Sequence, residues 1–250
     1  MQHWELLIFF LGVAFIYSSV GFGGGSSYLA ILAVYQLPVY EMKSIALICN
    51  IIVVTGGCIL FIRNRQVDIK KILPIVILSI PMAYLGALVK ISADTFFVVL
   101  GCSLILASVM LVLKAKTGRE VADKNSVVKG GIMGGAIGFL SGMVGIGGGI
   151  FLSPLLHLTR WDIPKKIAAT ASVFILVNSI SGLIAHLSKP MSTDINYSRI
   201  LLLCLAVFVG GQLGSRIGIK KLNETAIKRV TALLVFAAGV EVLIKHVHLI

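Results

Sequence analysis

Two glycine clusters are the segments of this sequence best suited to bind a ligand. The first reads Gly-Phe-Gly-Gly-Gly at positions 21–25, and the second reads Gly-Ile-Gly-Gly-Gly at positions 145–149. Glycine lets a ligand approach the backbone closely. A helix that begins after such a cluster directs free N–H groups and a partial positive charge at the ligand, which favours an anion by about 0.3–1 kcal/mol, or ~2 kcal/mol where the site is partly buried. We therefore predict an anion-binding site lined by Gly23, Gly24, Gly25, Gly147, Gly148 and Gly149.

Helix packing is the alternative role for a glycine in such a chain. Small residues let membrane helices approach one another closely, and we prefer this interpretation for the isolated glycines Gly86, Gly101, Gly134, Gly135, Gly138 and Gly214. For the two clusters we prefer ligand binding, because three consecutive glycines exceed what a packing contact needs. A phosphate-binding P-loop is excluded, since the pattern GxxxxGK[ST] is absent from the sequence.

Six small polar residues near the clusters extend the predicted site: Ser26, Ser27, Asn50, Thr170, Ser172 and Asn178. The hydroxyl-bearing residues follow a cluster or begin a helix. Each asparagine amide offers two donors and two acceptors, which suits a tetrahedral or pyramidal oxyanion. Hydrogen bonding between helices is the alternative role for both asparagines. Helical spacing also predicts one small polar stripe through Thr170, Phe174, Asn178, Ser181 and Ala185.

The composition indicates that lipid, not water, surrounds most of the chain. Hydrophobic residues make up 58% and charged residues 13% of its 250 residues, whereas a soluble domain carries about 25% charged residues. The net charge of +12 lies in short segments between long uncharged runs, which is typical of a polytopic membrane protein and not of a nucleic-acid-binding protein. A span needs about 20 apolar residues. The candidate runs are Leu6–Tyr40, Ser44–Ile62, Ile72–Val89, Thr95–Leu113, Gly130–Thr159, Ile167–Ser188, Ile200–Ser215 and Val230–Val240.

The chain also contains two copies of one unit. The glycine clusters lie 124 positions apart (21 to 145), Pro38 and Pro164 lie 126 apart, and Leu85-Gly86-Ala87 matches Leu213-Gly214-Ser215 at 128. A slowly growing offset is typical of a repeat whose loops differ by a residue or two. We place the first transmembrane repeat at residues 5–113, a basic cytoplasmic linker at 114–129 and the second transmembrane repeat at 130–245.

The charges of the loops predict that the two repeats are inverted. Cytoplasmic loops are rich in Lys and Arg, which assigns to the inside the loops 63–71, 114–129, 160–166 and 216–229. The loops assigned to the outside are 36–43, 90–94 and 189–197. We predict an all-α polytopic membrane protein of two inverted repeats, with both termini outside. Each repeat is a glycine-broken helix pair or a re-entrant hairpin, followed by three transmembrane helices.

Inverted repeats with interrupted helices are typical of secondary transporters. Backbone that leaves a helix inside a bilayer persists only where protein, water or a ligand satisfies its polar groups. An anion channel is the alternative function. An intramembrane enzyme is disfavoured, because it needs a nucleophile with a base or a metal cluster, and the spans hold isolated Ser, Cys and His residues. The cysteines Cys49, Cys58, Cys102 and Cys204 fit neither a metal site nor a disulfide framework.

Four segments resemble the sulfite exporter TauE/SafE family, also called TSUP: residues 21–26, 145–154, 163–172 and 210–216. The resemblance covers nearly the whole chain. It implies a transporter of small sulfur-containing anions such as sulfite, thiosulfate or sulfonates in the inner (cytoplasmic) membrane. The first repeat has Lys43-Ser-Ile-Ala where the second has Ala169-Thr-Ala-Ser, and we therefore expect two unequal half-sites.

We expect the partners of the chain to be a small anionic substrate and the lipid bilayer, with no nucleic acid, and a homodimer is one option for its oligomeric state. We assign no catalytic residue, metal ligand or cofactor. The alternative within the transporter class is a carrier for a non-sulfur organic anion. Glycine backbones and hydroxyls recognise charge and size, so the choice among oxyanions stays open.

Overall fold

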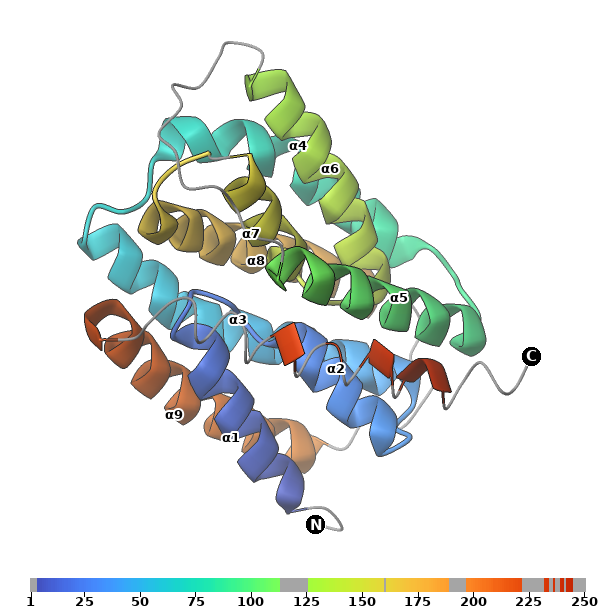
Figure 1. Cartoon of the computed structure of the whole chain (residues 1–250). Helices are drawn as coiled ribbons and strands as arrows, with labels where there is room; N and C mark the ends of the chain where they lie inside the picture. The colour runs from blue at the N-terminus through green and yellow to red at the C-terminus, as the bar shows by residue number, and fades with distance from the viewer. Residues whose placement is uncertain are drawn as a thin grey trace.

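The described part of the chain is helical. The computed structural model describes residues 4–112, 126–159, 161–188 and 197–221, and positions 232–233, 236, 239–240 and 242–244. The helices in chain order are α1 (Glu5–Ser18), α2 (Gly25–Val34), α3 (Val39–Arg63), α4 (Ile69–Leu88), α5 (Ala93–Val112), α6 (Ser126–Val144), α7 (Gly149–Leu158), α8 (Pro164–Leu187) and α9 (Tyr197–Lys221) (Figure 1). Most of the linker predicted at 114–129, and the last predicted span, fall outside the fully described ranges.

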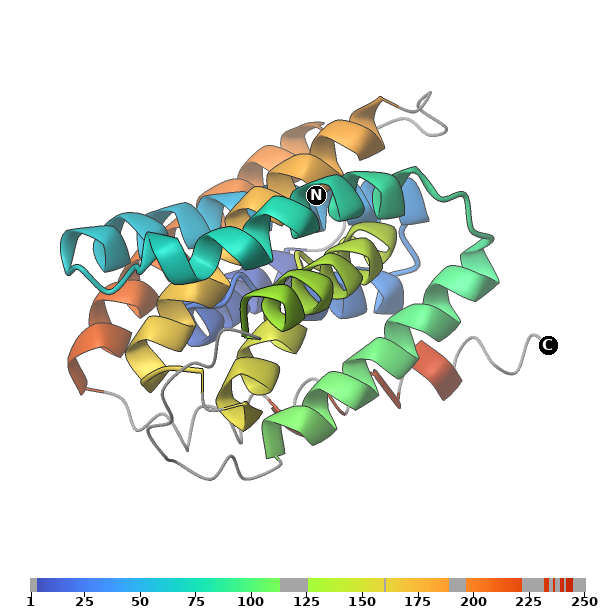
Figure 2. The ribbon, with the colours of Figure 1, turned by 90° about the horizontal axis from the view of Figure 1, so that it is seen from above.

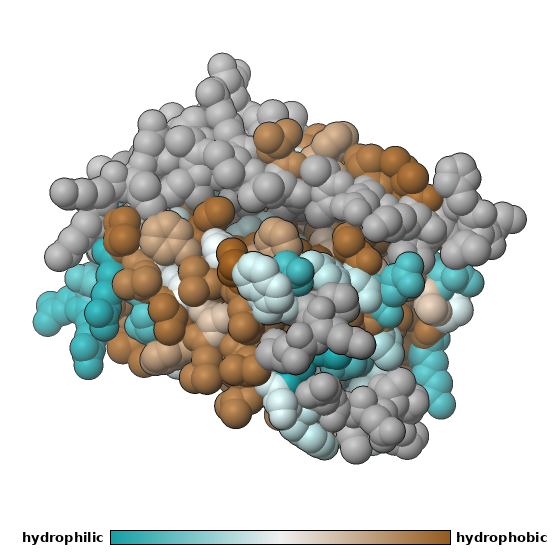
Figure 3. Space-filling model, turned by 90° about the horizontal axis from the view of Figure 1, so that it is seen from below, coloured by the Kyte–Doolittle hydropathy of each residue, from teal (hydrophilic) through white to brown (hydrophobic). Residues whose placement is uncertain are grey.

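Among the described residues, five helices are long and apolar enough to cross a membrane: α3, α4, α5, α8 and α9. Large apolar side chains on these helices are exposed, including Ile77, Leu106 and Leu201. A soluble protein rarely exposes so much apolar surface. Figure 3 shows apolar residues over much of the visible face, with hydrophilic residues at its left margin and over parts of its centre and right side. The predicted all-α polytopic membrane fold is confirmed.

The helix contacts of one half recur in the other. α1 packs along α9 and α6 packs along α4, while α3 contacts α9 and α8 contacts α4. Gly214 of α9 lies against the carbonyl oxygen of Phe15 in α1, and Gly86 of α4 lies against the carbonyl oxygen of Phe139 in α6. The two glycines are 128 positions apart and the two phenylalanines 124 apart. These offsets are those of the sequence repeat, so corresponding residues make corresponding contacts.

α3 and α8, which correspond to each other in the two halves, pack in opposite directions. Near one end, His186 of α8 lies with its Nε2 3.0 Å from the carbonyl oxygen of Tyr40 in α3. Near the other end, a Cβ added at Gly57 of α3 would lie 4.0 Å from the Oγ of Ser172 in α8. Antiparallel packing of corresponding helices is what an inverted repeat requires. The orientation of the halves across a membrane stays a prediction.

Each glycine-broken element is a hairpin that begins and ends at the same end of the helix bundle. α1 runs parallel to α9, because Gly210 of α9 faces Leu11 of α1 and, one turn later in both helices, Gly214 faces Phe15. α9 begins beside the start of α3, where Arg199 pairs with Glu41. α1 therefore begins at this end, and α2 returns to it because α3 follows after a short connection (Figure 1).

The second hairpin begins at the opposite end. α6 runs parallel to α4, because Gly134, Gly138 and Gly142 face Ile75, Ser79 and Ala83 in the same order. α4 begins beside the start of α8, where Lys71 pairs with Asp162. The hairpin of α6 and α7 therefore begins and ends at this end. A return to the same end is common to both forms that the sequence left open, the helix pair and the re-entrant hairpin.

Glycine packing holds the long helices together. A Cβ at Gly138 would lie 2.6 Å from the carbonyl oxygen of Ser79, which is too close for a larger residue to fit without movement of the backbone. Gly101 of α5 faces Gly239 and Leu243, two of the described positions near the C-terminus (Figure 2 shows this region). Each of the six isolated glycines contacts a neighbouring helix, so the packing interpretation of these positions is confirmed.

Candidate anion site

The first glycine cluster ends one helix and starts another. α1 stops at Ser18, and Gly21 and Gly24 have φ angles of +83° and +89°, a region that L-amino acids with a side chain rarely adopt. Gly24 is the N-cap of α2. The first helical hydrogen bond of α2 runs from the N–H of Tyr28 to the carbonyl of Gly24 at 3.0 Å. The N–H groups of the first turn are not used within the helix, and a glycine N-cap has no side chain to satisfy them.

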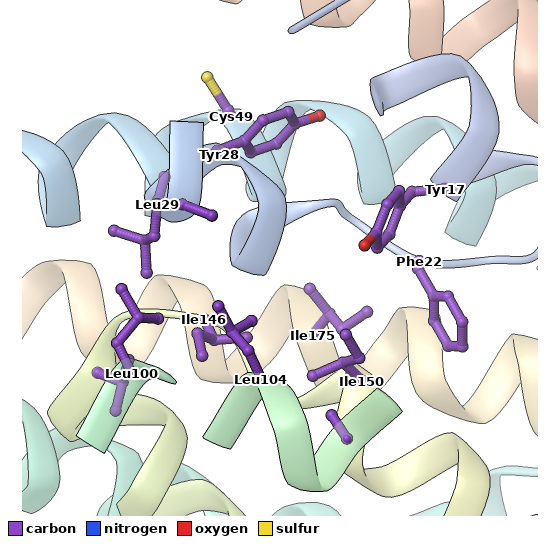
Figure 4. Close-up of a cluster of buried hydrophobic side chains, with 14 of the residues drawn as sticks. Tyr17, Phe22, Tyr28, Leu29, Cys49, Leu100, Leu104, Ile146, Ile150 and Ile175 are labelled. Atoms are coloured by element: carbon purple, nitrogen blue, oxygen red, sulfur yellow. The ribbon is translucent and has the colours of Figure 1, made fainter. Parts of the chain in front are cut away.

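The second cluster has a similar but not identical backbone. Gly145 and Gly148 have φ angles of +88° and +80°, and Gly148 is the N-cap of α7. Gly147 also has a positive φ, +82°, whereas its counterpart Gly23 does not. Ile146 and Ile150 of this break lie in a cluster of buried apolar side chains, together with Ile175 of α8 (Figure 4). The protein interior, not water, thus surrounds both breaks.

Asn50 of α3 lies between the two glycine clusters. It is fully buried, and its Nδ2 donates a hydrogen bond of 2.8 Å to the carbonyl oxygen of Ile146 in the second break. A Cβ at Gly23 or Gly25 of the first break would clash with its amide. The Asn50 Oδ1 has no hydrogen-bond partner among the described residues. Asn50 therefore connects the two breaks and keeps one acceptor available beside Gly23.

Ser172 of α8 makes the reciprocal connection. Its Oγ donates to the carbonyl oxygen of Gly21 at 2.6 Å and to that of Ala168 at 2.9 Å. We call α3 and α8 the central helices of the two halves. Each central helix thus contacts the glycine break of the other half. A movement of one half relative to the other must change these contacts at the site.

A buried lysine lies beside the second break. Lys43 of α3 donates from its Nζ to the carbonyl oxygen of Met143 at 2.7 Å, and a Cβ at Gly145 would lie 3.2 Å from its side chain. The Nζ also lies 4.8 Å from the centre of the Phe96 ring. Met143 is in the last turn of α6, so the lysine charge offsets the negative end of that helix dipole. The corresponding residue of the second repeat is Ala169, so the position equivalent to Lys43 carries no charge.

The structure brings some of the predicted site residues together at the breaks, whereas others form hydrogen bonds within their own helix. The glycines, Asn50 and Ser172 form the contacts described above. Ser26 and Ser27 are buried at the start of α2, and the Oγ of Ser27 lies 2.7 Å from the hydroxyl of Tyr17. Thr170 donates to the carbonyl of Lys166 at 2.9 Å, within its own helix. Asn178 likewise donates within α8, to the carbonyl of Phe174 at 2.8 Å.

Sequence reasoning missed Ser179 and Tyr28 as neighbours of the breaks. A Cβ at Gly147 would lie 2.6 Å from the Oγ of Ser179, and one at Gly24 would lie 3.0 Å from the hydroxyl of Tyr28. Both oxygens are buried and have no hydrogen-bond partner among the described residues. Ser179 lies two turns after Ser172, and this spacing is the signal that could have identified it.

The comparisons with known proteins agree with this architecture. A model of the family described as "Sulfite exporter TauE/SafE" matches residues 6–242. The chain is similar to the probable membrane transporter protein y4hK of Sinorhizobium fredii, at 30% identity over 242 residues that cover 95% of this chain and 97% of that protein. It is also similar to the probable membrane transporter protein YunE of Bacillus subtilis, at 29% identity over 238 residues that cover 84% and 86% of the two chains. No solved structure matches.

Proposed function

Because the chain belongs to the sulfite exporter TauE/SafE family of membrane transporters, we propose that it carries small sulfur-containing anions of the sulfite, thiosulfate or sulfonate class across the cytoplasmic (inner) membrane. The observation that supports this most directly is the convergence of two helix N-termini and a buried lysine on the glycine breaks that Asn50 connects. The proposed substrate-binding residues are the six cluster glycines, Ser26, Ser27, Asn50, Ser172 and Lys43.

The electrostatics of the breaks favours an anion over a cation. Each break adjoins the positive end of a short helix, and a buried anion gains up to ~2 kcal/mol from such an end. At the second break, Lys43 adds a full positive charge and offsets the negative end of α6. At the first break, the Ser172 hydroxyl donates to the carbonyl oxygen of Gly21, and the N–H groups at the start of α2 are the donors available to an anion. We therefore place the substrate's charge nearer to the second break. Its remaining oxygens accept from the second Nδ2 hydrogen of Asn50 and from the N–H groups at the start of α2.

Alternating access follows from the way that the halves share the site. The two hairpins begin at opposite ends of the bundle, and Asn50 and Ser172 each contact the break of the other half. Rocking of one half against the other would open the breaks to one end at a time. A negative cell interior favours outward movement of an anion by about 2.3 kcal/mol per charge for each 100 mV, so we infer that export is the favoured direction.

Transport into lipid vesicles tests this proposal. Vesicles that contain the purified protein and are loaded with unlabelled sulfite, thiosulfate or a sulfonate should take up the labelled anion by counterflow, with saturation. Large unitary currents without counterflow would show that the protein is an anion channel. Uptake of an organic carboxylate, with none for any of the three sulfur classes, would contradict the substrate class.

A further inference from the structure

Two ion pairs join the halves of the molecule outside the glycine breaks. Lys71 at the start of α4 pairs with Asp162, which precedes α8, with Nζ and Oδ2 2.6 Å apart. Arg199 at the start of α9 pairs with Glu41 at the start of α3, with Nη1 and Oε1 3.0 Å apart. We call them the Asp162 pair and the Glu41 pair.

The basic residues of the two pairs are counterparts in the repeat, whereas their acidic partners, 121 positions apart, lie on opposite sides of a helix start. Lys71 and Arg199 are 128 positions apart, which is the offset that relates Gly86 to Gly214, and each is the third residue of its helix. Their acidic partners, Asp162 and Glu41, lie within three residues of the starts of the central helices α8 and α3. Each pair therefore joins the two halves. Lys71 of α4, in the first half, meets the start of α8 in the second half, and Arg199 of α9, in the second half, meets the start of α3 in the first half.

The pairs lie at opposite ends of the bundle. Glu41 is in the first turn of α3, and Lys71 follows the other end of α3 after a short connection. At 1.5 Å per residue, the part of α3 from Glu41 to Arg63 is about 33 Å long. The hydrocarbon core of a bilayer is ~30 Å thick. One pair therefore belongs to each membrane face.

Each pair holds the outer end of a hairpin. Asp162 lies in the connection between α7 and α8, where Trp161 places its ring 5.5 Å below the Nζ of Lys71. Glu41 follows the connection between α2 and α3. The acidic side chains are largely buried, with 11% of Asp162 and 5% of Glu41 exposed. Opening the Glu41 pair leaves a buried carboxylate that must gain water. When Lys71 leaves, Asp162 keeps the N–H of Ile163 and the Nζ of Lys166, 3.9 Å away. Each opening separates the two helix starts that the pair joins.

We infer that the Asp162 pair and the Glu41 pair are two matched gates, which open alternately to connect the glycine breaks to one membrane face or the other. This inference rests on the proposed carrier function. In the present conformation both pairs are formed, which corresponds to a state closed at both faces. Opening the Glu41 pair frees the end of the first hairpin, and opening the Asp162 pair frees the end of the second.

Reversible cross-linking tests the gates. In a variant with the four native cysteines replaced by alanine, Lys71→Cys with Asp162→Cys, or Arg199→Cys with Glu41→Cys, can be joined by a short bis-methanethiosulfonate reagent that a reductant removes. Either cross-link alone should lower transport of labelled sulfite at least about tenfold, because it removes a conformation that the cycle requires. Reductant should restore transport, and binding of the anion should persist in the cross-linked protein.

A charge exchange in the otherwise native chain provides a second test. Lys71→Asp alone should lower transport, and adding Asp162→Lys should restore it, with the same pattern for Arg199→Glu and Glu41→Arg. Undiminished transport in both cross-linked proteins, or no rescue by either charge exchange, would overturn the proposal that the two ion pairs are gates. The wild-type protein separates the two claims: if it transports no sulfur anion, the proposed function is wrong, whereas transport that survives both cross-links contradicts the gates alone.

Discussion

The amide of Asn50 donates a hydrogen bond of 2.8 Å to the carbonyl oxygen of Ile146, 96 residues further along the chain. This bond joins the central helix of the first half to the glycine break of the second. The unpartnered Oδ1 of the same amide lies beside Gly23 of the first break. One side chain thus contacts both parts of the proposed anion site, and its position depends on how the halves are packed.

Replacing Asn50 should therefore cost more than replacing Asn178, although both are buried amides in corresponding helices. Asn50→Ala leaves the carbonyl of Ile146 without its partner, which should destabilise the protein by about 1–3 kcal/mol. Asn178 bonds within its own helix, where the backbone bond survives. Thermal unfolding in detergent and anion transport measure the difference. Equal losses for the two variants would contradict the bridging role of Asn50.

Gly23→Ala should impair transport far more than Gly12→Ala. A Cβ at Gly23 would clash with the Asn50 amide, whereas a Cβ at Gly12 would meet nothing within 4 Å. Displacement of the amide should weaken anion affinity about tenfold, equivalent to ~1.4 kcal/mol. The concentration that half-saturates transport reports this change. An unchanged half-saturating concentration in the Gly23 variant would show that the first break is not part of the anion site.

Lys43→Gln should weaken anion binding while Lys70→Gln leaves it near the wild-type value. Lys43 is buried beside the second break, and Lys70 is exposed at the start of α4. Removal of the buried charge should raise the half-saturating concentration about tenfold or more. Lys43→Arg, which keeps the charge, should recover part of the affinity. Equal effects of the two substitutions would show that Lys43 acts through the net charge of the protein and not through its position beside the second break.

The Asp162 pair should not titrate near neutral pH. Burial raises the pKa of Asp162, but the hydrogen bonds from Lys71 and from the N–H of Ile163, with the charges of Lys71 and Lys166, outweigh it and hold the pKa below its ordinary value of 3.8. The pair's contribution is therefore complete above that ordinary value and is lost only as pH falls through the lowered pKa. Asp162→Asn should change the rate of transport, but not the shape of its pH profile between about pH 5 and 8. A difference in shape within this range would contradict the pKa assignment.

Gly142→Leu should destabilise the contact between α4 and α6. A side chain at this position would clash with the carbonyl oxygen of Ala83, and overpacking typically costs about 1–3 kcal/mol. Gly131→Ala is the matched control on the same helix, because its Cβ would lie 3.5 Å from the carbonyl oxygen of Pro74. Thermal unfolding should show a large loss for the first variant and a small one for the second. A similar loss for both would indicate that helix propensity, not packing, governs these positions.

The sequence predicted the helices and the two breaks and named Asn50 as a candidate site residue, because each leaves a local signal. Long apolar runs, repeated glycines and a lone amide in an uncharged segment can all be recognised without knowledge of the fold. The repeat offset also related Gly86 to Gly214, for both of which helix packing was predicted, and the two glycines make equivalent contacts.

The face of α8 that meets the breaks could not be predicted in the same way. Thr170, Ser172 and Asn178 were chosen from this helix. Of the three, Ser172 contacts a glycine break, and Ser179, which was not chosen, lies beside Gly147. α8 is apolar and buried around most of its circumference, so periodicity does not indicate its orientation. Thr170 also bonds the carbonyl four residues earlier, an option that competes with contacts to other elements.

Lys43 was recognised only as a departure from the repeat. Its partner Met143 lies 100 residues away, and no local pattern relates the two. The role of Lys43 follows from packing of α3 against the end of α6, which the sequence alone does not define. Charge at a helix end becomes informative only once the neighbouring helix is known.

A density map of the protein with a bound sulfur anion tests the central claim most directly. Selenite or selenate, which resemble sulfite or sulfate and scatter more strongly, would mark the site. We predict density between residues 23–25 and residues 147–149, within hydrogen-bond distance of Asn50 and closer to the second break. Density elsewhere in the bundle, with the space between the breaks empty at a saturating anion concentration, would contradict the account.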